Sequence, residues 1–541
     1  MSQITTKEIA NLAGVSVGTV DRVIHNRGQV ADKTRKKIQE IIDKNGYEPN
    51  ILETYVLSSQ RDIESENKIK YGYHIHWPNL IVNQYNAFLI RMSAISGCRT
   101  LIKNGKLIND EKIFESDILI ENRVISKIDS SITINHPNTK VIDAEGNYIM
   151  PGIIDDQVHF REPGLTHKAN IFSESRAAVA GGITSYFEMP NTIPNTTKVA
   201  LLHDKFKIAE ENSIANYSFM FGGTNDNINE ILKINKKEVP AIKLFLGSST
   251  GNMLVDNPNS LENIFSKVDI PIAVHCEDET TIKDNLKLHI EAYGEEIPIT
   301  CHNKIRSEEA CYLSSSMAVA LAKKTGARLH VFHISTAKEL ALFENIPLKE
   351  KKITSEVCIH HLNFTEEDYI KFGSKIKWNP SIKTKNDQNE LWKALNTNLI
   401  DVIATDHAPH TFHEKQNNYQ NCPSGGPLVQ HSLVAMLEGY HEEKISLETI
   451  VKKMCHNPSI LFDVKNRGFI SEGYYADLVI FNLNKPWTVS KENLLYKCNW
   501  SPFENKSFKS RILHTFVNGN LVFTNGKLIE ECMGMKIEFE R

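Results

Sequence analysis

The sequence lacks several features that define whole classes of proteins. No apolar run approaches the roughly 20 residues that a membrane-spanning helix needs. The first residues, MSQITTKEIA, contain no apolar core of the kind found in signal peptides. The nine cysteines include no C-x-x-C pair, which favours reduced thiols over a disulfide framework. We therefore expect a cytoplasmic protein that does not associate with membranes.

A strong excess of one charge is also missing, because the net charge is -4 over 541 residues. Hydrophobic residues at 41% and charged residues at 24% are ordinary for a globular protein. The length predicts roughly three or four domains. Any DNA-binding surface must therefore be local, and the first fifty residues are locally basic. Their basic residues are Lys7, Arg22, Arg27, Lys33, Arg35, Lys36, Lys37 and Lys44.

The basic segment has the spacing of three short helices. Residues 5–14 carry apolar side chains at helical intervals, and Gly14 then breaks the chain. Ser16 is a helix cap in front of a second apolar series, and a third runs from about Lys33 to Ile42. A glycine-containing turn between the first two helices predicts a helix-turn-helix, although any small three-helix bundle has similar spacing.

The segment TTKEIANLAGVSVGTVDRVIHNRGQVADKTRKKIQEIIDKNGYEPN resembles the DNA-binding headpiece of the lactose-repressor family. The resemblance implies an all-α headpiece over residues 1–57 that binds DNA. It also implies base contacts from Val17, Gly18 and Arg22, of which Arg22 has the side chain best suited to reading a base. Repressors of this family continue into a long sugar-binding domain that dimerises them. Here residues 58–98 are polar and then aromatic, and we interpret them as a linker or a truncated remnant. A fused or misjoined reading frame is the alternative explanation for the whole N-terminal attachment.

The remainder of the chain has the pattern of a parallel barrel with β-rich flanks. Residues 99–150 and 466–541 contain short strand-like runs that echo each other, which predicts one composite β-sandwich. Between them, over residues 151–465, apolar runs alternate with helical stretches, which predicts an α/β fold of the (β/α)8 TIM-barrel type. The eight runs are 153–158, 184–189, 217–221, 242–246, 270–274, 329–332, 353–357 and 402–404.

Polar side chains follow most of these runs. A single histidine at a strand end is usually a packed structural residue, but three histidines with a lysine and an aspartate at the ends of one barrel are hard to explain by packing. Converging imidazole and carboxylate groups suit zinc or a similar divalent ion. The residues are His159, Asn191, Lys243, His275, His333 and Asp406.

Lys243 interrupts the apolar run AIKLFLG, where an unpaired ammonium group would be costly. The residue must therefore be paired with an acid, lowered in pKa, or modified. A lysine carboxylated by CO2 becomes an anion that is able to bridge two metal ions.

From about residue 100 to 531 the chain resembles the dihydroorotases of the amidohydrolase superfamily. The segments that carry the resemblance are PGIIDDQVHFREPGLTHK, MPNT, IKLFLGSSTGNM, AVHCED, HVFHIST, TSEVCIHHL, KWNPSIK and ATDHAPH. It implies one or two zinc ions held by His159, Lys243, His275, His333 and Asp406. It also implies that the substrate is held by Arg161, Asn191, Asn379 and His410.

The implied reaction is the reversible hydrolysis of L-dihydroorotate to N-carbamoyl-L-aspartate in pyrimidine biosynthesis. A bound divalent ion lowers the pKa of water toward neutrality and so supplies a nucleophile for the ring amide. Asp406 would take a proton from that water and return it to the leaving nitrogen. Arg161 matches a substrate carboxylate, which favours dihydroorotate over uncharged rings. An allantoinase- or hydantoinase-type cyclic amidase is the alternative.

One expected ligand differs, because Gln157 stands where the family pattern H-x-H has its first histidine. Glutamine is a poor zinc ligand, so one metal position should be weak or absent. One branch of dihydroorotases resembles this chain in having the segment DDQVH, so we expect an active enzyme. A pyrimidine-responsive DNA-binding regulator with an inert barrel is a further hypothesis. Against that hypothesis, palindromic DNA recognition needs two headpieces at a fixed spacing, which a loose tether of about forty residues would not fix. We expect a homo-oligomer.

Overall fold

A computed structural model describes residues 6–24, 30–45, 99–134, 136, 138–247 and 253–541. The chain divides into two compact units, Met1–Ala87 and Phe88–Arg541, which we describe separately. The predicted linker or remnant at residues 58–98 lies outside the described residues. None of the helices in the described ranges is both long and apolar enough to cross a membrane.

The first unit contains three helices around a small apolar core. They are α1 (Thr6–Ala13), α2 (Val17–Ile24) and α3 (Asp32–Asn45). Gly14 adopts a φ of +69° in the turn between α1 and α2, and the Ser16 hydroxyl caps α2 by accepting from the Thr19 amide at 3.2 Å. The core side chains are Ile9, Ala10, Ala13, Val20, Val23 and Ile38. The predicted helix-turn-helix is confirmed.

Parallel strands form the centre of the second unit. Strands β6, β7 and β8 form one parallel sheet, and the six strands from β9 through β14 form another. A parallel bridge between Val158 and His407 connects β6 to the residues that follow β14. Strands β8 and β9 are separated by Met220 alone and together fill one barrel position. All eight predicted runs overlap these strands, and the (β/α)8 barrel is confirmed. The strands are β6 (Ile153–Val158), β7 (Ile183–Glu188), β8 (Asn216–Phe219), β9 (Phe221–Gly222), β10 (Ile242–Phe245), β11 (Ile272–His275), β12 (Leu329–Val331), β13 (Ile353–Cys358) and β14 (Val402–Ala404).

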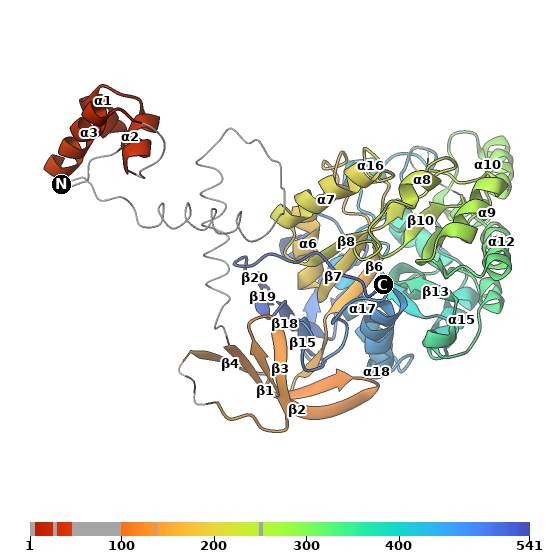
Figure 1. Ribbon diagram of the computed structural model, residues 1–541. Coiled ribbons are helices and arrows are strands. Elements are labelled where there is room, and N and C mark those ends of the chain that lie inside the picture. The colour runs from red at the N-terminus through yellow and green to blue at the C-terminus, as the bar shows by residue number, and fades with distance from the viewer. Residues whose placement is uncertain (1–5, 25–29, 46–98, 135, 137, 248–252) are drawn as a thin grey trace. The chain divides into compact units, whose positions relative to one another are not determined.

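Helices cover the outside of the barrel strands (Figure 1). The longest, α12 (Glu308–Thr325), is capped at its start by Ser307, whose hydroxyl accepts from the Ala310 amide, and at its end by Gly326 in the left-handed conformation. The helices are α6 (Ile171–Ala180), α7 (Val199–Asn212), α8 (Ile228–Ile231), α9 (Pro258–Lys267), α10 (Glu279–Tyr293), α11 (His302–Ile305), α12 (Glu308–Thr325), α13 (Ile359–Asn363), α14 (Tyr369–Phe372), α15 (Lys385–Leu395), α16 (Phe412–Lys415), α17 (Ser432–His441), α18 (Leu447–Val451) and α19 (Asn457–Leu461).

The two β-rich flanks meet in one nine-stranded sheet, in the order β20-β19-β18-β15-β5-β1-β2-β3, with β4 also paired to β1. Figure 1 shows orange strands from the first flank beside blue strands from the second. Buried side chains of both flanks, such as Ile118 and Ile480, share one apolar cluster. The predicted pairing of the flanks is confirmed. The strands are β1 (Arg99–Asn109), β2 (Lys112–Glu121), β3 (Val124–Asp129), β4 (Thr139–Asp143), β5 (Tyr148–Pro151), β15 (Leu478–Asn482), β18 (Arg511–Val517), β19 (Asn520–Thr524) and β20 (Lys527–Leu528); β16 (Trp487–Thr488) and β17 (Ser507–Phe508) form a separate pair.

The sheet and the barrel connect at Gly152, where a side chain has no room. A Cβ there would lie 2.0 Å from the Thr184 hydroxyl oxygen, so the chain passes from β5 into β6 only with glycine. The end of the chain also belongs to the barrel, because Ile537 and Phe539 are buried in one cluster with barrel residues such as Phe187. The C-terminal residues therefore help to fill the barrel interior as well as following the flanking sheet.

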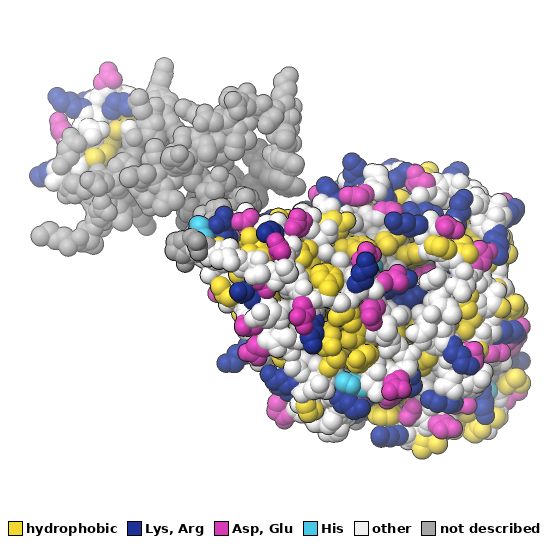
Figure 2. All heavy atoms as spheres, turned by 90° about the horizontal axis from the view of Figure 1, so that it is seen from below, with side chains coloured by type: hydrophobic (Ala, Val, Ile, Leu, Met, Phe, Trp, Pro, Cys, Tyr) yellow, Lys and Arg dark blue, Asp and Glu magenta, His cyan; other side chains and the backbone are white. Residues whose placement is uncertain are grey.

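Charge is mixed on the surface of this unit. Figure 2 shows dark-blue Lys and Arg side chains interleaved with magenta Asp and Glu side chains over the face in view. That face thus offers no broad basic field for a nucleic-acid backbone, in agreement with the net charge of -4.

Candidate active site

A cavity of about 200 Å³ lies at the carboxyl ends of the barrel strands. Pockets for drug-sized ligands are usually larger, so this one suits a small molecule. All nine residues that the sequence predicts for metal and substrate binding line it. They are His159, Arg161, Asn191, Lys243, His275, His333, Asn379, Asp406 and His410.

His159 lies between an amide and a carboxylate. Its Nδ1 donates to Asn191 Oδ1 at 2.8 Å, which leaves the lone pair on Nε2. That Nε2 faces Asp406 Oδ1 at 3.3 Å, so two acceptors point at each other. Burial, together with the positive charges of Arg161 and Lys243, holds the pKa of His159 well below its ordinary value. A neutral imidazole facing a carboxylate in this way fits a bound cation between them.

His275 and His333 form a second pair on the other strands. His275 Nε2 donates to Glu277 Oε2 at 2.8 Å, and its Nδ1 lies 2.9 Å from His333 Nε2. Burial alone would raise the pKa of Glu277, but Arg306 and His275 outweigh it and lower the pKa to about 2. The fixed anion orients His275 so that its Nδ1 lone pair faces the cavity, as carboxylates do behind metal-binding histidines.

Lys243 is the buried lysine that the sequence predicts. The residue is 1% exposed, and its ammonium group has no hydrogen-bond partner among the described residues; that group lies over the Phe245 and Phe332 rings at 4.7 and 4.2 Å. Burial lowers its pKa to about 7. Of the three sequence alternatives, pairing with an acid is not seen, while a lowered pKa is. A buried amine without a partner fits carboxylation, which needs the neutral amine.

One cavity residue, Arg161, has an unusual backbone conformation. Its φ is +69°, in a region that side chains other than Asn, Asp and His rarely occupy; His333 and Asp406 also have positive φ values, +41° and +45°. Burial raises the pKa of Asp406 to about 7. A carboxyl group that exchanges protons near neutrality is suited to general acid–base chemistry.

Arg161 supplies the positive end of the cavity. Its Nε donates to the Pro409 carbonyl at 3.1 Å, and its Nη2 lies 3.1 Å from His410 Nε2. Lys168 donates to His410 Nδ1 at 3.0 Å. Burial and the charges of Arg161 and Lys168 hold the pKa of His410 well below its ordinary value, so this imidazole is neutral. The guanidinium is 7% exposed, and burial lowers its pKa to about 10, which leaves it charged at neutral pH.

Several cavity features were missed by the sequence analysis. Trp378 and the loop segment 423–425 form part of the wall. Lys415 holds that loop, since its buried ammonium group donates to the carbonyls of Pro423 and Gly425 at 2.8 Å. The motif KWNPSIK signals Trp378, but no periodicity marks Lys415. Gln157 lines the cavity as expected, and its Oε1 accepts from the Cys358 thiol at 3.6 Å.

The predicted DNA-contacting residues share one face of α2. Val17 is 44% exposed, and Gly18 and Arg22 are exposed as well, while Val20 and Val23 point into the core. Arg22 Nε donates to the Gly18 carbonyl at 3.1 Å. Their role in binding DNA stays a prediction.

Comparisons with known proteins agree with both units. Residues 148–522 match the amidohydrolase family, and residues 5–50 match the lacI family of bacterial regulatory proteins. Similar proteins include the dihydroorotases of Methanosphaera stadtmanae and Clostridioides difficile, each 32% identical; both alignments span 78% of this chain and cover 96% and 99% of the relative. The dihydroorotase of Aquifex aeolicus is 33% identical over 79% of this chain and 99% of its own.

Solved structures show the same architecture. The L-hydantoinase (dihydropyrimidinase) of Arthrobacter aurescens superimposes with a TM-score of 0.77 at 27% identity, covering 81% of this chain and 99% of its own. The dihydropyrimidinase of Brevibacillus agri, at 23% identity and a TM-score of 0.74, covers 82% and 100% and shares the fold. With the cavity and these matches together, the chain belongs to the amidohydrolase family and is a cyclic amide hydrolase that carries a lacI-family helix-turn-helix.

Proposed function

We propose that the barrel hydrolyses L-dihydroorotate reversibly to N-carbamoyl-L-aspartate. The observation that carries the proposal is the buried guanidinium of Arg161, which lies in the same cavity as the candidate metal ligands. A charged ring substrate needs such an anchor, whereas an uncharged hydantoin does not. The similarity to dihydroorotases over more than three quarters of the chain supports the same substrate.

We assign the metal site to His159, Lys243, His275, His333 and Asp406, and zinc is the ion that best suits these ligands. When bound, the ion supplies an activated water and polarises the ring carbonyl. Asp406, whose pKa burial raises to about 7, accepts the proton of the attacking water and passes it to the leaving ring nitrogen. Arg161 and His410 hold the substrate carboxylate, with Asn191 and Asn379 at the cavity wall.

We also propose that Lys243 is N-carboxylated. The neutral amine attacks the carbon of CO2, a C–N bond forms, and one proton leaves to solvent, which converts the side chain to a carbamate anion. The lowered pKa of the amine, about 7, provides the neutral form that this addition requires. Intact-protein mass spectrometry at neutral pH should find the added mass of one CO2, which acidification removes.

The substrate assignment is tested by Arg161→Met with two substrates. The kcat/KM for L-dihydroorotate should fall about 100-fold, the order expected when a charge-assisted hydrogen bond is lost. The kcat/KM for an uncharged hydantoin should change little. Lys168→Met, which removes a cation that contacts His410 instead, is the matched control. Equal losses on both substrates, or hydantoin turnover without any dihydroorotate turnover in the unaltered chain, would favour the hydantoinase-type alternative.

We further propose that residues 1–57 bind DNA through α2, with Arg22 as the base-reading side chain and Val17 and Gly18 beside it. Recognition of a palindromic site requires two headpieces, which implies a homo-oligomer. Selection of binding sequences from a random DNA pool, followed by Arg22→Ala, tests this proposal. The variant should lose roughly 1–3 kcal/mol of discrimination at one base pair. Binding without any sequence preference would contradict it. An operator whose footprint shifts with dihydroorotate, in a chain without turnover, would favour the regulator hypothesis.

A further inference from the structure

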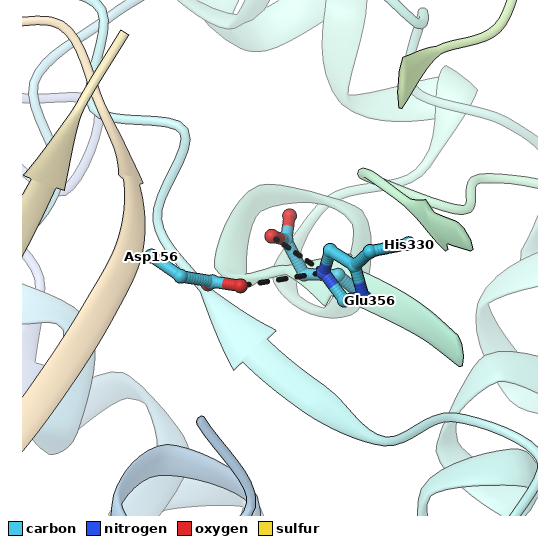
Figure 3. A group of neighbouring side chains, drawn as sticks. All are labelled: Asp156, His330 and Glu356. Atoms are coloured by element: carbon cyan, nitrogen blue, oxygen red, sulfur yellow. Dashed lines mark ion pairs between the residues drawn. The ribbon is translucent and has the colours of Figure 1, made fainter. Parts of the chain in front are cut away.

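A second group of histidine and carboxylate side chains lies inside the barrel. Asp156 comes from β6, His330 from β12 and Glu356 from β13, and each is 0% exposed. Figure 3 shows the two carboxyl groups turned toward the His330 ring. The distances from His330 Nε2 are 3.3 Å to Asp156 Oδ2 and 3.7 Å to Glu356 Oε2. None of the three residues lines the catalytic cavity.

The hydrogen bonds around His330 fix which nitrogen faces the carboxylates. The Thr354 hydroxyl donates to the Leu329 carbonyl at 3.2 Å, so its oxygen accepts from His330 Nδ1 at 2.9 Å. With the proton on Nδ1, a neutral ring presents its Nε2 lone pair to Asp156 and Glu356. Three acceptor atoms then converge on one point. Metal-binding histidines show the same arrangement, because one ring nitrogen donates a hydrogen bond and the other is left to bind the ion.

Three of the four carboxylate oxygens are not satisfied by hydrogen bonds from the described protein groups, whereas Glu356 Oε1 accepts from the His333 amide and the Cys358 thiol, each at 3.2 Å. Both Asp156 oxygens, Glu356 Oε2 and His330 Nε2 have no hydrogen-bond partner among the described residues. The Phe332 and Phe462 rings stand edge-on to His330 at 5.2 and 5.5 Å, so the surroundings are apolar. Two buried carboxylates in such surroundings are strongly unfavourable unless a cation compensates them.

A divalent ion satisfies both charge and distance. Two carboxylates and a doubly charged ion sum to zero, and so do two protons shared by the three groups, so the distances distinguish the ion. Ligand atoms about 2.0–2.1 Å from a tetrahedral ion lie about 3.4 Å from one another. The separations of 3.3 and 3.7 Å fall close to this value.

We propose that Asp156, His330 and Glu356 form a second metal site, separate from the catalytic cavity, which takes a divalent transition ion of the zinc class. The ion ties β6 to β12 and β13, so it is a structural site that forms as the barrel closes. Glu356 also links it to the cavity, because its Oε1 accepts from the backbone amide of His333 at 3.2 Å.

The test is metal content per chain, measured by mass spectrometry on the purified full-length protein. Asp156→Asn and Glu356→Gln should each lower the zinc content by one ion per chain, and the ion should resist chelators until the protein unfolds. Asp155→Asn removes a neighbouring buried carboxylate that bonds to Thr405 instead, and should leave the content unchanged. Asp406→Asn should lower the metal content of the cavity and leave the inner ion in place. A wrong assignment of the inner site is therefore distinguishable from a wrong assignment of the proposed function.

The competing occupant is a proton. Burial lowers the pKa of His330, but the two carboxylates outweigh it and raise the pKa to about 9 in the ion-free protein. Unchanged zinc content in Asp156→Asn and Glu356→Gln would therefore overturn the metal site in favour of an imidazolium. Should the variants fail to fold, anomalous diffraction at the zinc edge of the unaltered protein decides, and the absence of a peak between the three side chains overturns the proposal.

Discussion

Histidine and carboxylate groups gather at two levels of this barrel, and the levels differ in their surroundings. The candidate catalytic cavity collects side chains where the strands end, beside a cationic Arg161. The inner site collects Asp156, His330 and Glu356 from within three strands, in a fully buried and apolar setting. Under the roles we propose, the same ligand types bind a metal that acts on substrate at one level and a metal that cross-links strands at the other.

The largest expected effect is a loss of turnover when the cavity is altered, set against a loss of stability when the inner site is altered. Asp406→Asn should lower kcat for dihydroorotate about 10²- to 10⁴-fold, because the side chain that we propose moves the proton is lost. Asp156→Asn should lower thermal stability and leave the Michaelis constant close to that of the unaltered chain. Paired kinetic and melting measurements on the two variants check the comparison. A comparable loss of kcat in Asp156→Asn at full folding would show that the inner site takes part in catalysis.

The difference between the levels also explains what the sequence could predict. Residues at strand ends follow recognisable apolar runs, so His159, His275 and Asp406 could be found from their positions, as could all eight barrel strands. Asp156 lies beside Asp155 within β6, and only the register of the folded strands decides which of the two carboxyl groups faces His330. The register of a bulged strand depends on its contacts with neighbouring strands, and the pattern of apolar residues in one sequence does not predict it.

Other tertiary features were equally invisible. Ile537 and Phe539 follow the last strand of the flank by ten residues or so, and nothing in their spacing indicates that they help to fill the barrel. Lys415 was part of an ordinary polar loop in the sequence, but burial makes it the donor that holds the cavity wall. Loops and tails become specific through contacts that are distant in sequence.

A second prediction concerns the ion-free protein. Burial raises the pKa of Asp155 to about 7, so its stabilising protonated form is present at low pH and is lost as the pH rises toward 7. The free energy of unfolding of the chelated chain should fall by a few kcal/mol, roughly, between pH 4 and 7. Asp155→Asn should flatten this slope, and the exposed Asp204→Asn should not. Urea unfolding at several pH values provides the measurement, and an unchanged slope in Asp155→Asn would contradict the assignment.

The smallest expected effect addresses the altered ligand itself. Gln157→His places an imidazole at the cavity wall, where the present amide oxygen accepts from the Cys358 thiol. Imidazole is the better zinc ligand, so the cavity should retain metal about tenfold more tightly against a chelator, within the range by which single groups tune metal sites. Zinc remaining after dialysis against graded chelator checks this, with Gln157→Asn as the matched amide control. Asp156 is adjacent in the strand but does not line the cavity, so the inner ion should be unaffected in both variants. Loss of the inner ion in Gln157→His alone would instead show that the two levels share one metal and are not independent sites.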